Sequence, residues 1–262
     1  MTERPGFTLK PGLRVLVTAA AAGIGREIAE RLAAAGARIH ICDIDASALE
    51  ACQKDHPDWG ISRCDVADEA QVDRLFAEVR AHLGGLDALV NNAGIAGPTA
   101  EIGDIAPADW RRTIDINLNS HFYCTRLALP MLKQAGDGII INISSVAGRI
   151  GYAYRTPYAA TKWAIVGMTQ SLAKEQGPAG IRVNAILPGV TEGPRIEKVI
   201  AARAETVGFS YEEMEKYYVD KVSLRRMVTA GDIANMALFL CSAEGRNISG
   251  QALSVCGNVE TI

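Results

Sequence analysis

The stretch RVLVTAAAAGIG, residues 14–25, joins a short apolar run to a turn that ends in Gly23-Ile24-Gly25. The first five residues are mostly apolar and β-branched, which predicts a strand, and residues 24–35 follow a helical pattern. A Gly-x-Gly turn between a strand and a helix lets the backbone approach a pyrophosphate at the helix N-terminus. The stretch therefore predicts the first strand, turn and helix of a dinucleotide-binding domain.

Short apolar runs alternate with helical patterns along the rest of the chain. Mostly apolar strands between helices are typical of a parallel sheet covered on both faces. The sequence therefore predicts an α/β fold with a single doubly wound parallel sheet. The expected strands span residues 14–18, 38–42, 60–64, 88–91, 138–143, 182–187 and 252–255, and the expected helices span 24–35, 46–54, 69–83, 107–134, 156–176 and 231–242.

Residues 188–228 interrupt this alternation and are rich in charged and aromatic side chains. Ser210-x-x-Glu213 is a capping-box pattern that predicts a helix over residues 211–222. Because ligands of such sheets bind outside the carboxyl ends of the strands, we expect residues 188–228 to form a lid; an ordinary surface excursion is the alternative. The single domain, residues 1–262, then divides into a cofactor-binding and catalytic core (12–187), this substrate lid, and a last helix and strand (229–262).

The composition excludes several classes of protein. The chain has 262 residues, 48% of them hydrophobic, and a net charge of −3 without any run of Lys or Arg, which argues against nucleic acid and membrane partners. Residues 1–12 lack the apolar core of a signal peptide, and no apolar stretch is long enough to span a membrane. The six scattered cysteines suggest reduced thiols, and the four histidines show no metal-ligand spacing. We expect a cytoplasmic protein without a metal site.

Acidic residues at strand ends indicate which dinucleotide is bound. Asp43 ends the second expected strand, where a carboxylate bonds the adenosine ribose hydroxyls and repels a 2′-phosphate. No Arg or Lys lies in residues 18–25 or just after Asp43, so the sequence favours NAD over NADP. Asp65 ends the third strand, where it is expected near the adenine. Asn91 to Gly94 end the fourth, where buried asparagines tie strands together and small residues leave room for cofactor.

Tyr158 and Lys162 lie four residues apart on an expected helix and therefore share one face. A phenol with a pKa of about 10 needs roughly 4 kcal/mol of phenolate stabilisation to carry protons at neutral pH. One ammonium group about 4 Å away supplies on the order of 4 kcal/mol at an effective dielectric near 20. We predict that Lys162 makes Tyr158 an acid/base and that Ser145 binds the substrate oxygen, with chance proximity as the alternative.

These motifs together resemble the short-chain dehydrogenase/reductase family from the first strand to the C-terminus. The residues that carry the resemblance are Thr18–Gly25, Asp65, Asn91–Gly94, Asn117, Ser144-Ser145, Tyr158-x-x-x-Lys162 and Pro188-Gly189. The resemblance implies a Rossmann-type sheet of about seven strands with a pyridine nucleotide across its carboxyl edge. It also implies reversible hydride transfer between a secondary alcohol, or its ketone, and NAD.

The resemblance implies a role for each matching residue. Tyr158 is the acid/base, and Lys162 holds the nicotinamide ribose and lowers the pKa of Tyr158. Ser145 steadies the reacting oxygen, and Asn117 holds a water that relays protons to Lys162. The residues expected to contact the cofactor are these two, Tyr158 and Lys162, together with Thr18, Ala20, Gly23, Ile24, Gly25, Asp43, Asp65, Val66, Asn92, Ala93, Gly94, Pro188, Gly189, Val190 and Thr191.

Two positions depart from the family pattern. Ala19 replaces the usual first glycine of the turn; we expect it to keep a negative φ and to alter cofactor affinity without abolishing binding. Thr191 follows Gly189 by only two residues, where the family often has a longer spacing; its hydroxyl is expected near the nicotinamide carboxamide.

Arginines dominate the expected substrate pocket. Arg149 and Arg155 lie between Ser145 and Tyr158, and Arg195 lies in the expected lid. A guanidinium fork suits a carboxylate, sulfonate or phosphate, although each arginine alone more often bonds a backbone carbonyl or reaches solvent. We expect a small polar secondary alcohol as substrate: a hydroxy acid, a polyol or a sugar-derived compound.

Two other functions stay open: an NADPH-dependent 3-oxoacyl-(acyl-carrier-protein) reductase-like ketoreductase, and a non-catalytic NAD-sensing regulator. Asp43 argues against the first, and the complete set of Asn117, Ser145, Tyr158 and Lys162 argues against the second.

The expected helices at 107–134 and 156–176 resemble the family's oligomer-forming pair, so a homotetramer, or a dimer, is expected. Four apolar residues of the first helix exceed what one core stripe needs, with burial in the monomer as the alternative: Leu127, Leu129, Met131 and Leu132.

Overall fold

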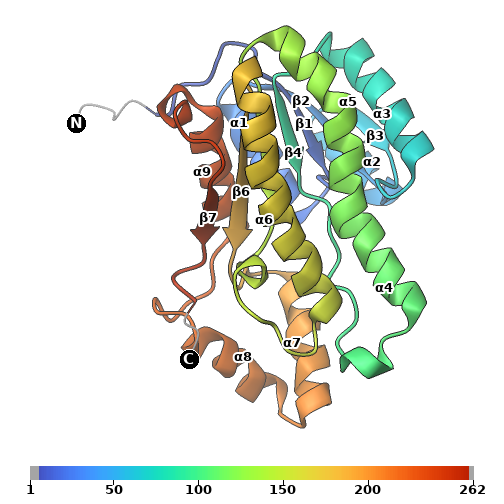
Figure 1. The fold of residues 1–262 in the computed structure, drawn as a ribbon, viewed down its shortest axis with the longest axis vertical. Helices are drawn as coiled ribbons and strands as arrows, with labels where there is room; N and C mark the ends of the chain where they lie inside the picture. Colours follow the sequence, from blue (N-terminus) through green and yellow to red (C-terminus); the bar gives the residue numbers. More distant parts are fainter. Residues whose placement is uncertain (1–5, 260–262) are drawn as a thin grey trace.

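A computed structural model describes residues 6–259, so both ends of the expected domain, residues 1–5 and 260–262, lie outside the described residues. One parallel seven-stranded sheet has the order β3 (Gly60–Arg63), β2 (Arg38–Asp43), β1 (Arg14–Thr18), β4 (Ala88–Asn91), β5 (Ile139–Ile143), β6 (Arg182–Pro188) and β7 (Ala252–Val255) (Figure 1). Strands β2 and β3 lie on one side of β1, and β4 to β7 lie on its other side, so the strand order reverses between β1 and β4. Ligands of doubly wound sheets bind at this switch point, outside the carboxyl ends of the strands.

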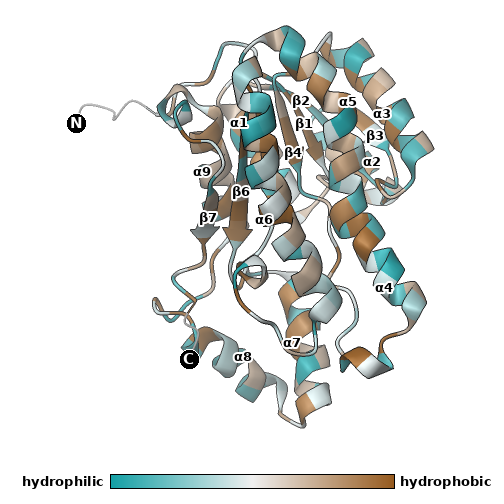
Figure 2. Cartoon of the chain, in the orientation of Figure 1, coloured by the Kyte–Doolittle hydropathy of each residue, from teal (hydrophilic) through white to brown (hydrophobic). Residues whose placement is uncertain are grey.

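Two hydrophobic layers enclose the sheet. On one face lie α1 (Gly23–Ala34), α2 (Ala46–Asp55) and α9 (Ala230–Cys241); on the other lie α3 (Glu69–Leu83), α5 (Ser120–Ala135) and α6 (Thr156–Gln176). Successive strand residues face opposite layers, so Val15 and Val17 pack beneath the first and Leu16 beneath the second. Figure 2 shows the hydrophobic strands of the sheet behind helices of mixed polarity.

The expected helix at 107–134 is not continuous. It consists of α4 (Pro107–Ile114), a π-helical turn at Asp115–Asn119, and α5. A π turn adds one residue to a helical turn, and such insertions often occur at functional sites. Periodicity alone does not reveal it, because the apolar positions on either side still repeat at helical spacing.

The 188–228 segment contains two helices rather than the single helix expected at 211–222. The additional helix, α7 (Pro194–Val207), precedes α8 (Tyr211–Asp220). The predicted capping box is confirmed: the Ser210 hydroxyl accepts from the Glu213 N–H, and the Glu213 carboxylate accepts from the Ser210 N–H. Both helices lie below the carboxyl ends of the strands in Figure 1.

The apolar stripe of α5 belongs to the monomer core. Met131 and Leu132 are buried, and Leu127 and Leu129 are partly buried against the same cluster. These four side chains therefore give no support to an oligomer. Within residues 6–259, no helix combines the length and apolar character that crossing a bilayer requires.

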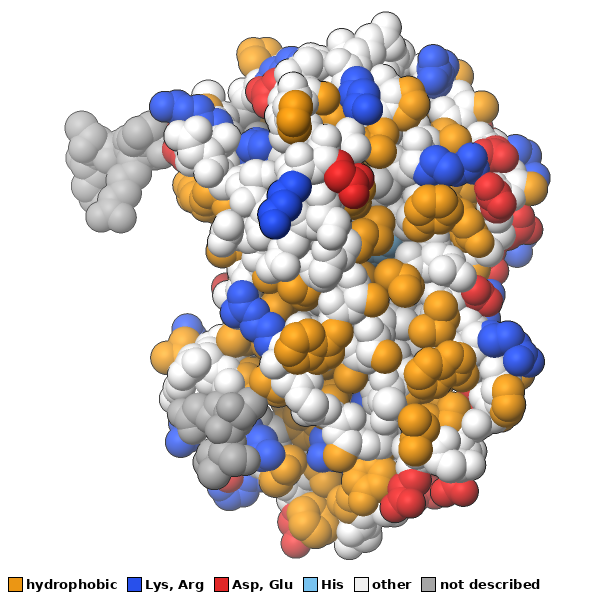
Figure 3. All heavy atoms as spheres, viewed as in Figure 1, with side chains coloured by type: hydrophobic (Ala, Val, Ile, Leu, Met, Phe, Trp, Pro, Cys, Tyr) orange, Lys and Arg blue, Asp and Glu red, His pale blue; other side chains and the backbone are white. Residues whose placement is uncertain are grey.

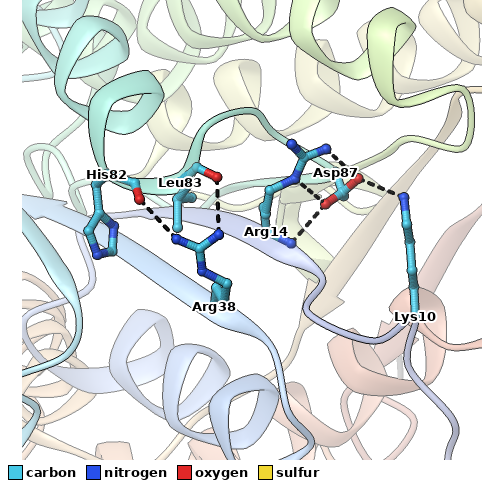
Figure 4. A network of polar contacts seen from close by, with 6 residues as sticks. All are labelled: Lys10, Arg14, Arg38, His82, Leu83 and Asp87. Carbon is cyan, nitrogen blue, oxygen red and sulfur yellow. Dashed lines mark hydrogen bonds and ion pairs between the residues drawn. The ribbon is translucent and has the colours of Figure 1, made fainter.

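The amino ends of the central strands are joined by a charge network (Figure 4). Asp87, just before β4, is 1% exposed and accepts from the Arg14 Nε at 2.7 Å and from the Lys10 Nζ at 2.9 Å. Burial alone would raise the pKa of Asp87, but bonds from Arg14 and Lys10 outweigh it and lower the pKa to about 2. Arg38, at the start of β2, donates to the His82 and Leu83 carbonyls at the end of α3. The buried carboxylate at this end of the sheet is therefore paired with cations, and the Arg38 guanidinium is bonded to backbone carbonyls.

Candidate active site

Four predicted catalytic side chains converge on the opposite edge of the sheet. Ser145 follows β5 directly, Tyr158 and Lys162 lie in the first turns of α6, and Asn117 lies in the π turn. Gly94, which follows β4, borders two of them: a Cβ added there would lie 3.4 Å from both the Asn117 Oδ1 and the Lys162 Nζ. A methyl group at this position would touch both side chains at van der Waals distance, so Gly94 borders this corner of the site.

Tyr158 is surrounded by cations. The Lys162 Nζ lies 5.6 Å from the centroid of the Tyr158 ring, and the guanidinium carbons of Arg155 and Arg195 lie 5.0 Å and 5.9 Å from it. Burial alone would raise the pKa of Tyr158. Lys162, Arg195, a hydrogen bond with Ser145 and Arg155 together outweigh that effect and hold the pKa below 10. The environment therefore favours a phenolate, as proton transfer requires.

Lys162 is buried, and its Nζ donates to the Ile143 carbonyl at the end of β5 at 2.8 Å. Burial is the main cause that lowers the pKa of Lys162 to about 8; the Tyr158 charge opposes this and Arg195 adds to it. Ser144, adjacent to Ser145, instead donates to the Lys162 carbonyl and so supports α6.

The Asn117 side chain is occupied by protein groups. Its Oδ1 accepts from the Ile95 N–H at 2.7 Å, and its Nδ2 donates to the Ile95 carbonyl at 3.1 Å and to the Thr161 Oγ1 at 3.2 Å. The π turn thus clamps the chain after β4 against α6. The relay water predicted from the family resemblance stays a prediction.

The turn between β1 and α1 fits a pyrophosphate. Gly23 has a φ of +59°, and a Cβ there would meet nothing within 4 Å, so the space beside the helix N-terminus is open. A Cβ on Gly25 would lie 2.5 Å from the Ala19 carbonyl oxygen and would clash with it, so only glycine lets the helix lie this close to the preceding turn. The N-cap residue Ala22 supplies no side-chain cap, which leaves the first N–H groups of α1 for an anion.

The expected backbone of Ala19 is wrong. Its φ is +50°, in the left-handed region, where a non-glycine residue costs about 1–2 kcal/mol. The neighbouring turn holds it there, because the Asn92 Nδ2 donates to the carbonyls of Thr18 and Ala19 at 3.0 Å and 2.9 Å. The Thr18 hydroxyl accepts from the N–H groups of Asn92 and Ala93. Thr18 and Asn92 therefore shape the turn.

Asn91, the last residue of β4, links neighbouring strands through its side chain, as predicted. Its Nδ2 donates to the Asn142 Oδ1 of β5 at 2.9 Å and to the Thr125 hydroxyl of α5 at 3.2 Å. The two strands on either side of the active site are thus fixed relative to α5.

At the adenosine end, both predicted carboxylates lie at strand ends. Asp43 accepts from the Ala21 N–H at 3.1 Å, which holds it beside the turn before α1. Asp65 accepts from the Ala67 N–H and pairs with Arg112 at 3.3 Å. Val66, the next residue, is buried.

Two arginines that the sequence did not indicate lie near these carboxylates. A cavity of about 460 Å³ is lined by Ile44, Arg63, Asp65, Gln71 and Arg74. Arg63 pairs in register with Asp43 across β2 and β3, so it lies one strand away from the carboxylate, not along the same segment. Strand pairing, rather than proximity in the sequence, is the signal that finds it.

At the nicotinamide end, β6 leads into Pro188, Gly189, Val190 and Thr191. A Cβ on Gly189 would lie 2.7 Å from the Cα of Cys256, so this bend packs directly against the end of β7. The Thr191 hydroxyl donates to the Gly189 carbonyl at 3.2 Å. Its predicted contact with the cofactor stays a prediction.

The three predicted substrate arginines separate into two groups. Arg155 is 3% exposed, bonds the Ala96 carbonyl at 2.7 Å and leaves its buried Nε–H without an acceptor among the described residues. Arg195, at the start of α7, is exposed above the same tyrosine. Arg149 donates instead to the Ala252 carbonyl and to the Ser254 hydroxyl of β7 at 3.1 Å, so β7 occupies its guanidinium.

A group of tyrosines that the sequence did not predict lies beside Arg155. Tyr152, Tyr218 of α8 and Arg203 of α7 contact one another, and the hydroxyls of the two tyrosines share a hydrogen bond. Burial and the neighbouring Tyr218 raise the pKa of Tyr152 above its ordinary value. Spacing in the sequence gives no signal for this group, because its members come from three separate segments.

Known proteins resemble the chain over almost its full length. A family model described as enoyl-(acyl carrier protein) reductase matches residues 18–258. D-beta-hydroxybutyrate dehydrogenase of Cupriavidus necator is 37% identical over 251 residues, which cover 94% of this chain and 97% of that protein.

Solved structures give the same result. NAD+-bound xylitol dehydrogenase has a TM-score of 0.90 and 28% identity, covering 95% of this chain and 99% of that one. Actinorhodin polyketide ketoreductase with NADPH has a TM-score of 0.89 and 32% identity, covering 93% of this chain and 95% of that one. These two solved structures hold a nicotinamide cofactor on the fold described above. The chain therefore belongs to the short-chain dehydrogenase/reductase family and is an oxidoreductase that acts on CH–OH groups.

Proposed function

We propose that the protein is an NAD-dependent dehydrogenase of a small hydroxy acid, interconverting the secondary alcohol and its ketone. The observation that carries this proposal is the excess of positive charge around Tyr158. Arg155 and Arg195 both lie over its ring, and neither forms an ion pair within residues 6–259. A buried cation without a counterion is costly, and a substrate carboxylate would offset that cost.

The chain's own groups account for proton movement in this reaction. In the oxidation, the Tyr158 phenolate takes the hydroxyl proton while Ser145 donates a hydrogen bond to the same substrate oxygen. Lys162 holds the ribose and stabilises the phenolate. When bound, the nicotinamide accepts the hydride from the carbinol carbon, which becomes the carbonyl carbon. Arg195, exposed at the rim, is available to hold a carboxylate, and the buried Arg155 acts through its contact with the Tyr158 ring.

The choice of NAD rests on Asp43, whose carboxylate is fixed beside the turn before α1. A 2′-phosphate there would meet this negative charge. A specific observation favours the rival reading, an NADPH-dependent ketoreductase: Arg63 and Arg74 line the cavity next to Asp43 and are able to bind a phosphate. We favour NAD because Asp43 is the closer to the turn, through its bond to Ala21.

The substrate proposal is tested by matched substrates. Initial rates of reduced-cofactor formation are measured with NAD and with NADP on hydroxy acids, their neutral amides and polyols, using wild type and Arg195→Gln. We expect kcat/KM to favour hydroxy acids over their amides by about tenfold with NAD, and Arg195→Gln to abolish that preference. Arg149→Gln, whose guanidinium bonds β7, is the matched control and should keep it. Equal rates for acids and amides would refute the anionic substrate, and faster reaction with NADP would favour the ketoreductase.

We also propose a homotetramer. Phe122 of α5 and Trp163 of α6 are 53% and 51% exposed, and the face over these helices in Figure 3 presents many hydrophobic side chains. Large exposed apolar residues on adjacent helices suit a protein interface. Light scattering should give four times the chain mass; a value near 27.9 kDa would contradict the proposal.

A further inference from the structure

Aromatic rings and arginines alternate from the catalytic tyrosine to the 188–228 segment. The guanidinium carbon of Arg155 lies 5.0 Å from the Tyr158 ring centroid and 5.4 Å from that of Tyr152. The guanidinium carbon of Arg203 lies 5.4 Å from the Tyr152 centroid and 5.6 Å from that of Tyr218. We call these five residues the Tyr–Arg stack: Tyr158, Arg155, Tyr152, Arg203 and Tyr218.

The Tyr–Arg stack crosses between two parts of the fold. Arg155 and Tyr158 begin α6, and Tyr152 lies in the loop that leads to it. Arg203 and Tyr218 lie on α7 and α8 of the 188–228 segment. Arg203 is the central connection, because its Nη1 donates to the Tyr218 hydroxyl at 3.3 Å while its guanidinium also contacts the Tyr152 ring.

Backbone hydrogen bonds attach both ends of the 188–228 segment to the residues around the end of β7. The Gly189 N–H donates to the Val255 carbonyl, and the Leu224 N–H donates to the Gly257 carbonyl. The buried apolar residues of the segment form a small cluster of their own, separate from the two layers that enclose the sheet. That cluster comprises Val190, Ile200, Ala204, Met214, Tyr218 and Val222. Between these two ends, Arg203 and Tyr218 both contact Tyr152 and so connect the helices of the segment to the catalytic loop.

The chemistry of Arg203 suits this connection. It forms no ion pair within the described chain, and its Nε is buried without a hydrogen-bond partner. Its guanidinium also lies 5.7 Å from the Tyr217 ring centroid, so three tyrosines surround it. Cation–π contacts strengthen as the cation is removed from water, and a flat guanidinium stacks on rings as an ammonium does not.

We propose that Arg203 is a positioning residue that holds α7 and α8 against Tyr152 and thereby closes the lid over Tyr158. When Arg203 is lost, fewer molecules have the closed, binding-competent pocket. Apparent substrate affinity falls by that fraction, while the chemical step in the closed complex is unchanged. The inference rests on the proposed function only for the choice of assay substrate.

The test compares Arg203→Met and Arg203→Lys with Lys198→Met, which removes an exposed cation from the same helix. We expect Arg203→Met to raise KM about tenfold, equivalent to about 1.4 kcal/mol, with kcat within twofold of wild type and NADH affinity unchanged. Arg203→Lys keeps the charge but not the flat fork, so about a threefold increase is expected. Lys198→Met should match wild type. A fall in kcat and melting temperature with KM unchanged would overturn the proposal, because it would make Arg203 a merely structural residue.

A second measurement needs no substrate. Hydrogen–deuterium exchange of residues 194–220 in the NADH-bound protein should be about tenfold faster in Arg203→Met than in wild type, and unchanged in Lys198→Met. Equal exchange in Arg203→Met and wild type would overturn the proposal. If the proposed hydroxy-acid specificity fails, this exchange result still stands, so the two failures are distinguishable.

Discussion

Buried charges are paired at the amino ends of the strands, the amino edge of the sheet, and unpaired at the carboxyl ends, its carboxyl edge. At the amino edge, the buried carboxylate of Asp87 is matched by Arg14 and Lys10 at bonding distance. At the carboxyl edge, Arg155, Arg195 and Arg203 gather around tyrosine rings without an ion pair to any described acid. A matched buried charge stabilises the fold, whereas unmatched cations create a potential that acts on whatever binds or ionises beside them.

A related contrast separates two partly buried tyrosines that both contact Arg155. Tyr158 also faces Lys162 and Arg195, and its pKa lies below the ordinary value. Tyr152 also faces Arg203, yet burial and the neighbouring Tyr218 outweigh both arginines and raise its pKa. The lysine beside Tyr158 and the second tyrosine beside Tyr152 therefore give the two phenols opposite pKa shifts.

The largest test of this contrast is removal of the Tyr158 hydroxyl. Tyr158→Phe should lower kcat by about 10²–10⁴, because a positioned acid/base contributes about that factor, while NADH binding is retained. Tyr152→Phe loses only a structural hydrogen bond, so its kcat should stay within a few-fold of wild type. Steady-state rates and NADH titration measure both. Similar losses of kcat in the two variants would contradict the assignment of the proton carrier.

The second test removes the paired carboxylate of Asp87 at the amino edge of the sheet. The pKa of Asp87 is about 2 when folded, against 3.8 for the ordinary group, so its ionised form contributes about 2 kcal/mol to stability. That contribution is present above about pH 4 and is lost as the pH falls towards 2. Urea unfolding should show Asp87→Asn to be less stable by about 2 kcal/mol at pH 7, with a flatter acid dependence.

Asp55→Asn is the control for this measurement, because Asp55 pairs with Arg26 at the surface and should matter far less. Activity of Asp87→Asn at saturating substrate should equal that of wild type. Unchanged stability would mean that the network in Figure 4 does not support the sheet.

A third, smaller effect concerns backbone strain at the carboxyl edge. Ala19→Gly removes the methyl group from a left-handed position and should stabilise the protein by about 1 kcal/mol. Ala20→Gly, next to it but without a positive φ, should destabilise it, because glycine loses more chain entropy on folding. Thermal unfolding of the two variants measures both signs. A destabilised Ala19→Gly would show that the turn does not strain Ala19.

The smallest expected effect is the one that Arg195 has on the pKa of Tyr158, because the exposed charge of Arg195 is screened by solvent. Removing it disfavours the Tyr158 phenolate, so the pKa of Tyr158 rises and the base form needed for oxidation is reached only at higher pH. The acidic limb of the pH profile of kcat should therefore move upward in Arg195→Gln and stay in place in Arg149→Gln. A limb that does not move would assign the pH dependence to Lys162 and Arg155 alone.

The sequence predicted most of the framework because its signals are local. Strands β1, β4 and β7 and helices α3 and α6 have the predicted bounds, since apolar periodicity and caps act over a few residues. The gathering of Ser145, Tyr158 and Lys162 followed from helical spacing and the family resemblance. The π turn at Asn117 and the strain at Ala19 were missed because they arise from contacts with Ile95, Thr161 and Asn92, which are distant in the chain.

The sequence by itself determined the doubly wound sheet and the family, and it placed Tyr158 and Lys162 on one face of a helix, because each depends on repeating patterns or fixed spacings along the chain. Only the tertiary structure decided which charges are matched. Whether Arg149 bonds β7, whether Arg63 lies beside Asp43, and whether Arg203 meets Tyr152 all depend on which segments fold against one another. Electrostatic and stacking energies fall with distance through space, and distance along the chain carries little of that information.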